Sequence, residues 1–331
     1  NDSNPVVQRV QFTGRFHLDY AFQDAAQGQM EEWNIRRLRL GAKVKLFGDY
    51  TFHGEVDLNP QEPNPLYSRL TDMHLSWSRS KEFVATVGKH GAPFTLDGST
   101  SSKELLTTER SNLANNIWFT NQYFPGVSAS GQINQWRYRA GIYSGGAGNH
   151  EFGEFNGGAF GLVSGGYDFA KAWNAKQALL AVNYVENDPD INNTWTRSLR
   201  RVGSINFSYE ATKWGARADL SAGEGYLGAS DLWGATLMPF YNITERVQVV
   251  ARVTHVVSED PNGLRPALYG SRVVSARGDE YNEAYLGLNY YIHGHKLKLQ
   301  TGVQSAEMAD SARDGGLYAG WGWTTGLRMF W

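Results

Sequence analysis

The clearest chemical pattern in the sequence is a run of alternating cations in residues 34–46, "NIRRLRLGAKVKL". Arg37, Arg39, Lys43 and Lys45 fall on odd positions, and the even positions from 38 to 46 hold only leucine, alanine and valine. Successive side chains of a strand point to opposite faces, so this segment has one cationic and one apolar face. The apolar face suits lipid or a neighbouring subunit, and the cationic face suits water and passing anions.

Other cations reach the same face if the apolar side of every expected strand points outward. The full inward set is Arg15, Arg37, Arg39, Lys43, Lys45, Arg137, Arg139, Arg217, Arg246, Arg252, Lys296, Lys298 and Arg328, and the inward acids are Asp19, Glu55, Asp57, Asp72, Asp219 and Glu283. The formal net charge of -2 therefore conceals a positive interior and acidic loops. Rings of arginine and lysine in a pore favour anions. The alternative is that these cations only pair with the inward acids.

The elements that position these groups are strands joined by turns. Alternation such as that in "VQFTGRFHLDYAF" and "YTFHGEVDL" recurs along the whole chain, and it gives roughly sixteen strands, an even number as in bacterial outer-membrane barrels. Short joints such as "FGD", "INQ" and "HGH" alternate with long polar ones such as "QDAAQGQMEE", "NPQEPNPLYS" and "NDPDINNT". We therefore expect an all-β fold, a transmembrane antiparallel β-barrel of sixteen strands, with residues 1–331 as a single domain.

Composition excludes several other classes of protein. The 331 residues include no cysteine, so disulfides and thiolate metal sites are absent, and the net charge argues against a nucleic-acid partner. No apolar run is long enough for a transmembrane helix. A mean hydropathy of -0.46 fits a soluble protein or a membrane barrel, in which only alternate residues face lipid. The first residues, "NDSNPVVQ", lack the features of a signal peptide, so we expect a mature chain.

Aromatic residues near the ends of the expected strands support a membrane barrel. They are Trp33, Tyr50, Trp77, Trp136, Trp195, Trp214, Trp233, Tyr290, Tyr291 and Trp323. Such rings form girdles at the two membrane interfaces, although tyrosine and tryptophan are also common in any strand. The sequence ends on Phe330 and Trp331, and terminal aromatics of this kind are typical of outer-membrane proteins.

One long segment, residues 91–118, interrupts the hairpins, and loops of this length are usually functional. Ser101 and Glu104 have the spacing of a capping box, which predicts a short helix over 102–111. If the segment folds into the barrel, Lys103 and Arg110 stand at the narrow point, with Asp97, Glu104 and Glu109 as nearby acids. The alternative is an extracellular loop with a solvated helix.

Three stretches resemble the phosphate-selective porin O and P family of outer-membrane proteins. They are "TGRFHLDYA" with Arg15, "NIRRLRLGA" with the paired Arg36 and Arg37, and "SSKELLTTERSNL" with Arg110 in a Glu-Arg motif. They lie in family order in the first third of the chain. The resemblance implies a trimeric sixteen-stranded barrel in the bacterial outer membrane, a constriction loop at about 91–118, and an arginine track leading to a phosphate site.

The chain departs from the family pattern at two places. The family has a lysine after Leu-Glu in the inward loop, whereas this chain reads Leu96-Asp97-Gly98. Arg36 and Arg37 cannot both point inward on a regular strand, so either the strand is bulged or Arg36 extends to the lipid–water interface. We therefore expect a general anion preference, and phosphate selectivity stays open.

The sequence thus predicts a water-filled outer-membrane channel for passive diffusion of small anions or other small hydrophilic solutes, with no enzymatic activity and no cofactor. The residues expected to line it are Arg15, Arg37, Arg39, Lys43, Lys45, Lys103, Arg110, Arg137, Arg139, Arg217 and Arg252, of which Arg15, Arg37, Arg39, Lys103 and Arg110 are expected nearest the narrow point. No metal site is expected, since the histidine pair at 293 and 295 lacks a third ligand. The alternatives are an outer-membrane barrel enzyme and a soluble carbohydrate-binding β-sandwich.

Overall fold

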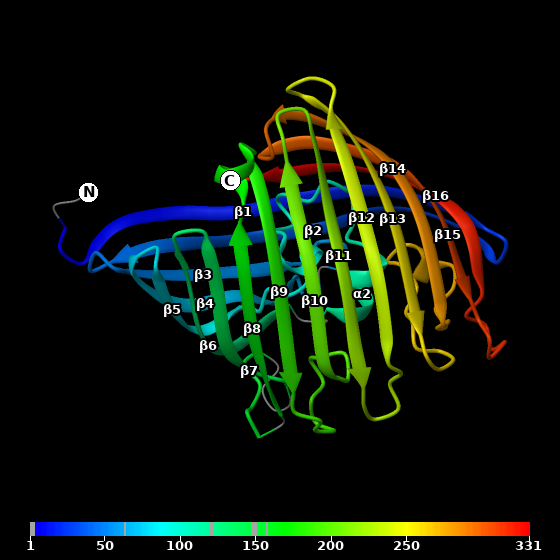
Figure 1. Ribbon diagram of the computed structural model, residues 1–331, viewed down its shortest axis with the longest axis horizontal. Helices are drawn as coiled ribbons and strands as arrows, with labels where there is room; N and C mark the ends of the chain where they lie inside the picture. The colour runs from blue at the N-terminus through cyan, green and yellow to red at the C-terminus, as the bar shows by residue number, and fades with distance from the viewer. Residues whose placement is uncertain (1–3, 63, 119–121, 147–150, 157) are drawn as a thin grey trace.

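The computed structural model describes residues 4–62, 64–118, 122–146, 151–156 and 158–331, and within them the chain forms sixteen strands (Figure 1). The strands are β1 (Val7–Ala25), β2 (Gly28–Leu46), β3 (Tyr50–Leu58), β4 (Tyr67–Ser80), β5 (Phe83–Gly91), β6 (Tyr123–Ile133), β7 (Trp136–Ser144), β8 (Ala159–Asp168), β9 (Gln177–Asn187), β10 (Leu199–Glu210), β11 (Trp214–Gly225), β12 (Leu232–Asn242), β13 (Val247–Ser258), β14 (Glu280–His293), β15 (Leu297–Ala309) and β16 (Tyr318–Phe330).

Each strand pairs antiparallel with its neighbours in sequence, and β1 pairs with β16 to close the barrel. Closure leaves no unpaired sheet edge, which is the condition for strands to cross a membrane. The outer face is apolar, with Phe12 76% exposed, while the inward His17 and Asp19 of the same strand are fully buried. The closed barrel confirms the expected fold and excludes the β-sandwich. Among the described residues, no helix is long and apolar enough to cross a membrane.

Connections of different length lie at the two rims. On one rim, strands meet in short turns such as 47–49, 81–82, 134–135 and 294–296, with the small helix α3 (Ala170–Trp173) in the connection from β8 to β9. The other rim carries longer segments, including 59–66, 188–198 and 259–279. The expected long loop over residues 23–32 is wrong, because β1 and β2 continue as paired strands as far as Ala25 and Gly28. That hairpin turns over two residues only.

The aromatic girdle is confirmed for most of the residues expected in it. Rings on the outer face include Trp33, Trp136 and Trp214, each more than half exposed. Two of the expected positions are wrong. Trp195 lies in the connection after β9 and packs against the interior cluster, and the hydroxyl of Tyr291 donates inward to Gln248.

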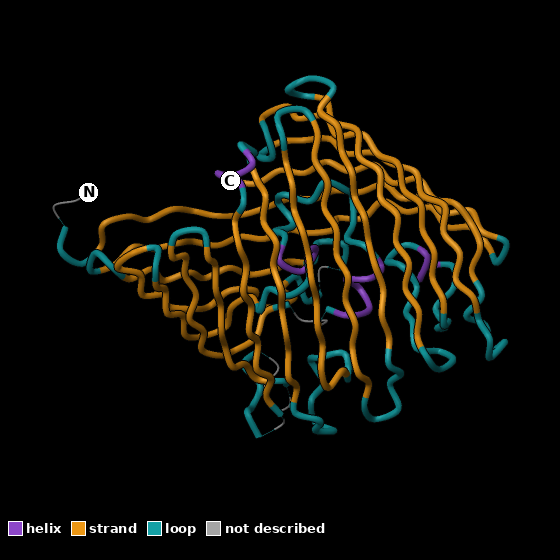
Figure 2. The backbone as a smooth tube through the Cα atoms, in the orientation of Figure 1, coloured by secondary structure: helices purple, strands orange, loops and turns teal. Residues whose placement is uncertain are grey.

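The long segment between β5 and β6, hereafter the constriction loop (residues 92–122, of which 119–121 are not described), folds into the barrel as expected (Figure 2). Its helices are α1 (Leu96–Ser99) and α2 (Asn112–Ile117), so the helix expected over 102–111 is wrong. The backbone carbonyls of this stretch accept hydrogen bonds from the barrel wall instead of from a following helical turn. Nζ of Lys298 lies 2.5 Å from the carbonyl of Leu105, and a guanidinium nitrogen of Arg328 lies 3.0 Å from that of Thr108.

Apolar side chains fix the constriction loop to one side of the barrel interior. Phe94, Leu113 and Ile117 are fully buried and belong to one cluster with inward apolar residues of the wall. Those wall residues include Phe124, Phe160, Leu162, Val185, Val202, Leu232 and Val256. A second cluster places Leu106 against Met238, Phe240, Val250 and Tyr285. The loop therefore covers the wall formed mainly by β6 and β8–β14, and the charged wall of β1–β4 faces it.

A second segment, residues 259–279 between β13 and β14, also enters the barrel, which the sequence did not predict. It contains a turn of 3-10 helix, η1 (Gly270–Arg272), and buries Leu264, Tyr269 and Val274. Side-chain amides of α2 donate to its backbone, for example Asn116 to the carbonyl of Arg265 at 3.1 Å. The two inward segments thus support each other.

Candidate functional site

The paired arginines of β2 both reach the interior because the strand is bulged. His17 lies opposite Arg37 and Leu18 lies opposite Ile35, so Arg36 is the extra residue. An inserted residue reverses which parity faces inward. Trp33 before the bulge accordingly points outward, whereas Arg37 after it points inward. Of the two expected explanations for the pair, the bulge is confirmed and the interfacial position of Arg36 is wrong.

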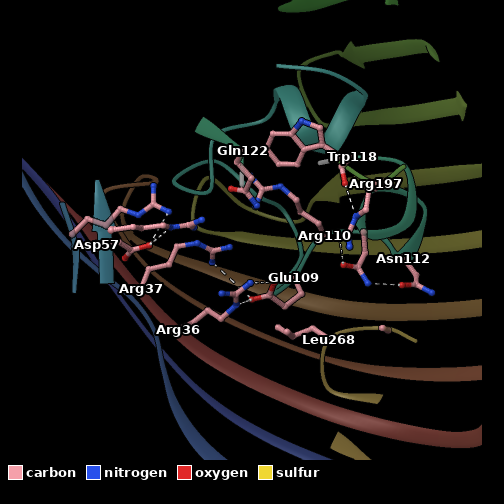
Figure 3. Close-up of a pocket in the computed structure, with 15 residues that line it drawn as sticks. Arg36, Arg37, Asp57, Glu109, Arg110, Asn112, Trp118, Gln122, Arg197 and Leu268 are labelled. Carbon is pink, nitrogen blue, oxygen red and sulfur yellow. Dashed lines mark hydrogen bonds and ion pairs between the residues drawn. The ribbon is translucent and has the colours of Figure 1, made fainter. Parts of the chain in front are cut away.

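Glu109 of the constriction loop forms ion pairs with both of these arginines (Figure 3). Nε of Arg36 lies 2.7 Å from Oε1 of Glu109, and the nearest nitrogen of Arg37 lies 3.9 Å from the same oxygen. Burial alone would raise the pKa of Glu109, but Arg36 and Arg37 lower it to about 2. The carboxylate is therefore ionised at neutral pH and ties the loop to β2.

Arg15 and Arg39 belong to a charged network on the wall formed by β1–β4. Arg15 lies 3.1 Å from Glu55 and donates to the hydroxyl of Ser102 in the loop at 2.8 Å. Arg39 lies 3.6 Å from Glu55 and 3.3 Å from Asp57. Carboxylates thus compensate these two guanidinium groups, which are 8% and 2% exposed. They position the wall, and the carboxylates reduce the positive charge that the two groups present to a passing ion.

Two cavities lie between this wall and the constriction loop. The larger, about 270 Å³, is lined by Arg36, Arg37, Arg39, Arg69, Arg110 and Arg197 and by the acids Asp57 and Glu109. The other, about 250 Å³, extends past Arg15, Asp72 and Ser102. Five residues line both, namely Arg37, Arg39, Arg110, Trp118 and Gln122. These residues therefore lie between the two cavities, a position called the narrow point below. Six arginines against two carboxylates give the larger cavity an excess of four positive charges.

The sequence profile of the phosphate-selective porin O and P family matches residues 10–238, more than half of the chain. The chain belongs to this family of porins. It is thus an outer-membrane channel for small hydrophilic solutes, formed by a transmembrane β-barrel. No curated protein sequence matches the chain.

Solved structures share the fold of this porin at low sequence identity. An anion-selective porin from Comamonas acidovorans is 12% identical, with a TM-score of 0.69 over 98% of this chain and 99% of that one. OprB of Pseudomonas putida is 10% identical, with a TM-score of 0.67 over 97% and 94% of the two chains. OmpT of Vibrio cholerae is 11% identical, with a TM-score of 0.62 over 98% and 100%.

Arg110 is the predicted loop cation that lines both cavities. Its guanidinium donates to the backbone carbonyls of Asp97 at 2.8 Å and Thr100 at 3.0 Å, and it lies 5.3 Å from the ring of Trp118. These partners are neutral, so they hold the group without cancelling its charge. Burial lowers the pKa of Arg110, and the nearby carboxylates of Asp97 and Glu109 oppose that shift.

Lys103 lies further along the loop, beside the last strand. Its Nζ is 4.9 Å from the centre of the Phe330 ring, and the side chain is partly buried. Burial, followed by repulsion from Arg15, lowers the pKa of Lys103. The structure thus keeps Lys103 in the loop, as expected, but outside the set of residues that lines the two cavities.

Arg252 holds the loop, in contrast to the expected pore-lining position. Its Nε lies 2.8 Å from Glu283, and its terminal nitrogen donates to the Thr107 hydroxyl at 3.0 Å and to the Glu109 carbonyl at 2.8 Å. Arg252 lines neither of the two cavities, in contrast to Arg37 and Arg39. Arg328 pairs with Asp19 and acts on the loop in the same way.

The remaining predicted cations lie away from the narrow point. Lys43 and Lys45 are exposed on the cationic face of β2, toward the 47–49 turn, and Arg137 pairs with Asp168 at 2.6 Å near another short turn. Arg139 and Arg217 lie on the inward faces of β7 and β11 and are partly buried. The inward position expected for Arg246 and Lys296 is wrong, since both are exposed in turns at the rim.

The sequence did not predict three of the arginines that line the larger cavity. Arg36 was expected to line the channel only if its strand was bulged. Arg69 follows an irregular part of β4, where the alternation of inward and outward side chains is interrupted. Arg197 precedes β10, and its Nε donates to the carbonyl of Trp118 at 2.9 Å. Burial, with repulsion from Arg265 and Arg277, lowers the pKa of Arg197 to about 9, so it is charged at neutral pH. No local pattern distinguished it from other loop arginines.

Proposed function

We propose that this porin prefers anions and that the arginine-lined cavities beside the constriction loop set that preference. The observation that carries the proposal is the excess of four positive charges around the larger cavity, on both the wall and the loop. Low-dielectric walls focus this field on the narrow point, which raises the local concentration of anions and excludes cations.

The proposed mechanism is partial exchange of hydration water for arginine donors. An anion at the narrow point meets Arg37, Arg39 and Arg110, which line both cavities. Guanidinium groups donate charge-assisted hydrogen bonds to oxyanions in a planar, bidentate geometry. Wall carboxylates weaken the total field, so the anion binds transiently and leaves. Nothing is transformed chemically, and we propose that the protein is not an enzyme.

Phosphate is the anion that we propose to compete best for this site. Gly98 stands where the family has a lysine, and the acid before it is kept as Asp97. An acid facing the pore would oppose phosphate. The carboxylate of Asp97 instead accepts a hydrogen bond from the backbone N–H of Ser111 at 2.7 Å, and the residue is 3% exposed. Asp97 therefore braces the loop and presents little negative charge to a passing ion.

Zero-current potentials across a planar bilayer in a KCl gradient test the anion preference. We expect anions to carry most of the current, and a cation-selective channel would overturn the proposal. Adding phosphate to the chloride solution tests the finer claim. We expect millimolar phosphate to reduce the chloride conductance of the wild type more than that of Arg37→Gln, and equal reduction would refute a phosphate site at the narrow point.

The remaining expectations concern assembly. Family membership points to the bacterial outer membrane. We propose that the porin is a homotrimer there and that residues 1–331 form one domain. One of the solved OmpT structures with this fold is described as a trimer form. Crosslinking in outer-membrane vesicles tests the trimer, and a monomer as the only species would contradict it.

A further inference from the structure

A histidine and carboxylate cluster on the β3–β4 wall has no role in the proposed anion path. His53 on β3 lies directly opposite His74 on β4, and Asp72 lies two residues before His74, on the same face. Oδ1 of Asp72 is 3.6 Å from Nδ1 of His53 and 3.4 Å from Nδ1 of His74. One ligand atom from each residue lies within 4.8 Å of the others.

These separations suit a metal ion. Ligands at about 2.0–2.2 Å from a tetrahedral zinc ion are roughly 3.3 Å apart, close to the distances between Asp72 and each imidazole. Because cross-strand neighbours on one face are close, small side-chain rotations suffice to converge on a single ion. Two imidazoles and one carboxylate form a three-ligand set that leaves a position open for water or solute.

The cluster also has unsatisfied nitrogen atoms. Within the part of the chain that the structure describes, Nε2 of His53 and Nδ1 of His74 are shut off from solvent and make no hydrogen bond, and His53 is 9% exposed. Buried polar atoms are normally paired, so Nδ1 of His74, which faces Asp72 at 3.4 Å without a hydrogen bond, is available to bind an ion. The atom of His53 that faces Asp72 is Nδ1, at 3.6 Å. His90, close to His74, differs because both its nitrogens have partners, the Gly88 carbonyl at 2.9 Å and the Ser128 hydroxyl at 2.8 Å.

Asp72 is set apart from the other acids of this wall. Glu55 and Asp57 pair with arginines, whereas the ion pairs recorded for Asp72 among the described residues are with His53 and His74 alone. Asp72 also lines the cavity of about 250 Å³, which gives a small cation a route to the cluster from the channel. Lys43 on β2 lies opposite His53 in register, and its positive charge would repel a bound cation.

We propose that His53, Asp72 and His74 bind a divalent first-row transition metal ion, with Zn²⁺ as the probe of choice, in the wall of the channel. Imidazole with one carboxylate favours Zn²⁺, Ni²⁺ or Cu²⁺ over Ca²⁺ and Mg²⁺, which prefer oxygen ligands alone. The bound ion adds positive charge beside the arginine-lined cavity and withdraws a carboxylate from it. The occupied channel therefore differs from the empty one in conductance.

Isothermal titration of the whole, detergent-solubilised porin with ZnCl₂ tests this site. We expect one equivalent per chain in the wild type and loss of that binding in both Asp72→Asn and His74→Ala. His255→Ala is the matched control, because His255 lies on a strand but bonds to Asn282 away from the cluster. Unchanged zinc binding in both cluster variants, or equal loss in the control, would overturn the site.

Two further measurements separate a missing site from a damaged barrel. Heat-modifiable migration on a gel shows whether each variant is folded, and anomalous diffraction at the zinc edge locates the ion in the wild type. Density between His53 and His74 supports the site, and density only elsewhere refutes it. Lys43→Gln removes the opposing charge and is expected to tighten zinc binding roughly fivefold. Neither binding test depends on the anion preference, so the two proposals fail separately.

Discussion

Neighbouring residues of the constriction loop provide a pair of substitutions with opposite predicted effects on ion selectivity. Arg110→Gln removes a positive charge that neutral carbonyls hold at the narrow point, and Glu109→Gln removes the carboxylate that compensates Arg36 and Arg37. Glutamine is similar in size to glutamate and retains hydrogen-bonding groups. Both side chains line the same cavity, so the two changes act on the same ion.

The size of the effect follows from Coulomb's law. A monovalent ion about 5 Å from the lost charge feels roughly 0.8 kcal/mol in water, and screening in 0.1 M salt reduces this to about 0.5 kcal/mol. Such an energy changes the entry of anions and of cations about twofold each, in opposite directions. The anion-to-cation permeability ratio should therefore fall about fivefold in Arg110→Gln and rise by a similar factor in Glu109→Gln.

Zero-current potentials in a KCl gradient give the permeability ratio of each variant directly. Single-channel conductance and heat-modifiable migration, measured in parallel, verify that the pore and barrel are intact. Shifts of the same sign in the two variants, or no shift in Arg110→Gln, would refute the assignment of selectivity to these cavities. Repeating the measurement in 1 M salt should shrink both shifts, because the screening length falls to about 3 Å.

Three further predictions concern the loop and the barrel closure. Arg252→Met removes bonds to the loop and leaves the buried Glu283 without its cationic partner. We therefore expect a melting temperature lowered by several degrees and noisier single-channel currents, and an unchanged melting temperature and current would contradict the positioning role. Burial raises the pKa of Glu109 and the adjacent arginines lower it to about 2, so its ion pairs stabilise the fold fully above pH 4.5 and lose that contribution as pH falls toward 2. The melting temperature should therefore fall more steeply over this pH window in the wild type than in Glu109→Gln. Parallel curves for the two proteins would exclude the ion pair. In Gly14→Val, a Cβ would lie 2.3 Å from the ring of Trp331, so we expect slower assembly in vitro than for Gly203→Val, where the space is open.

The architecture could be predicted because the alternation that specifies each strand is local. The alternation around residues such as Phe12 and His17 predicts which side chains point outward and which point inward, and the short turns interrupt that alternation. The sequence predicted that a bulge at Arg36 was possible, but not that it forms. Two adjacent arginines showed that an irregularity was needed if both faced inward, but the register of β1 against β2 decides whether it forms.

The interior was harder to predict because tertiary contacts fix it. Ser101 and Glu104 have a helix-start spacing, yet wall cations such as Lys298 and Arg328 take the carbonyls that a helix would use. The 259–279 segment carries no periodic pattern, and its inward course depends on partners far away in sequence, such as Asn116. The meeting of His53 and His74 beside Asp72 was likewise not predicted, since residues on two strands meet only through cross-strand register.

The anchoring of the constriction loop through main-chain carbonyls has a consequence for engineering. Lys298, Arg328 and Arg252 bond to main-chain carbonyls, which every amino acid possesses, so these three attachments do not depend on the side chains of the loop. The contacts of Leu106, Thr107 and Glu109 do depend on their side chains. Exposed side chains of the loop that make none of these contacts can therefore be changed while the loop stays attached to the wall. Libraries confined to exposed loop positions such as Glu104 could be screened for new solutes without redesigning the barrel.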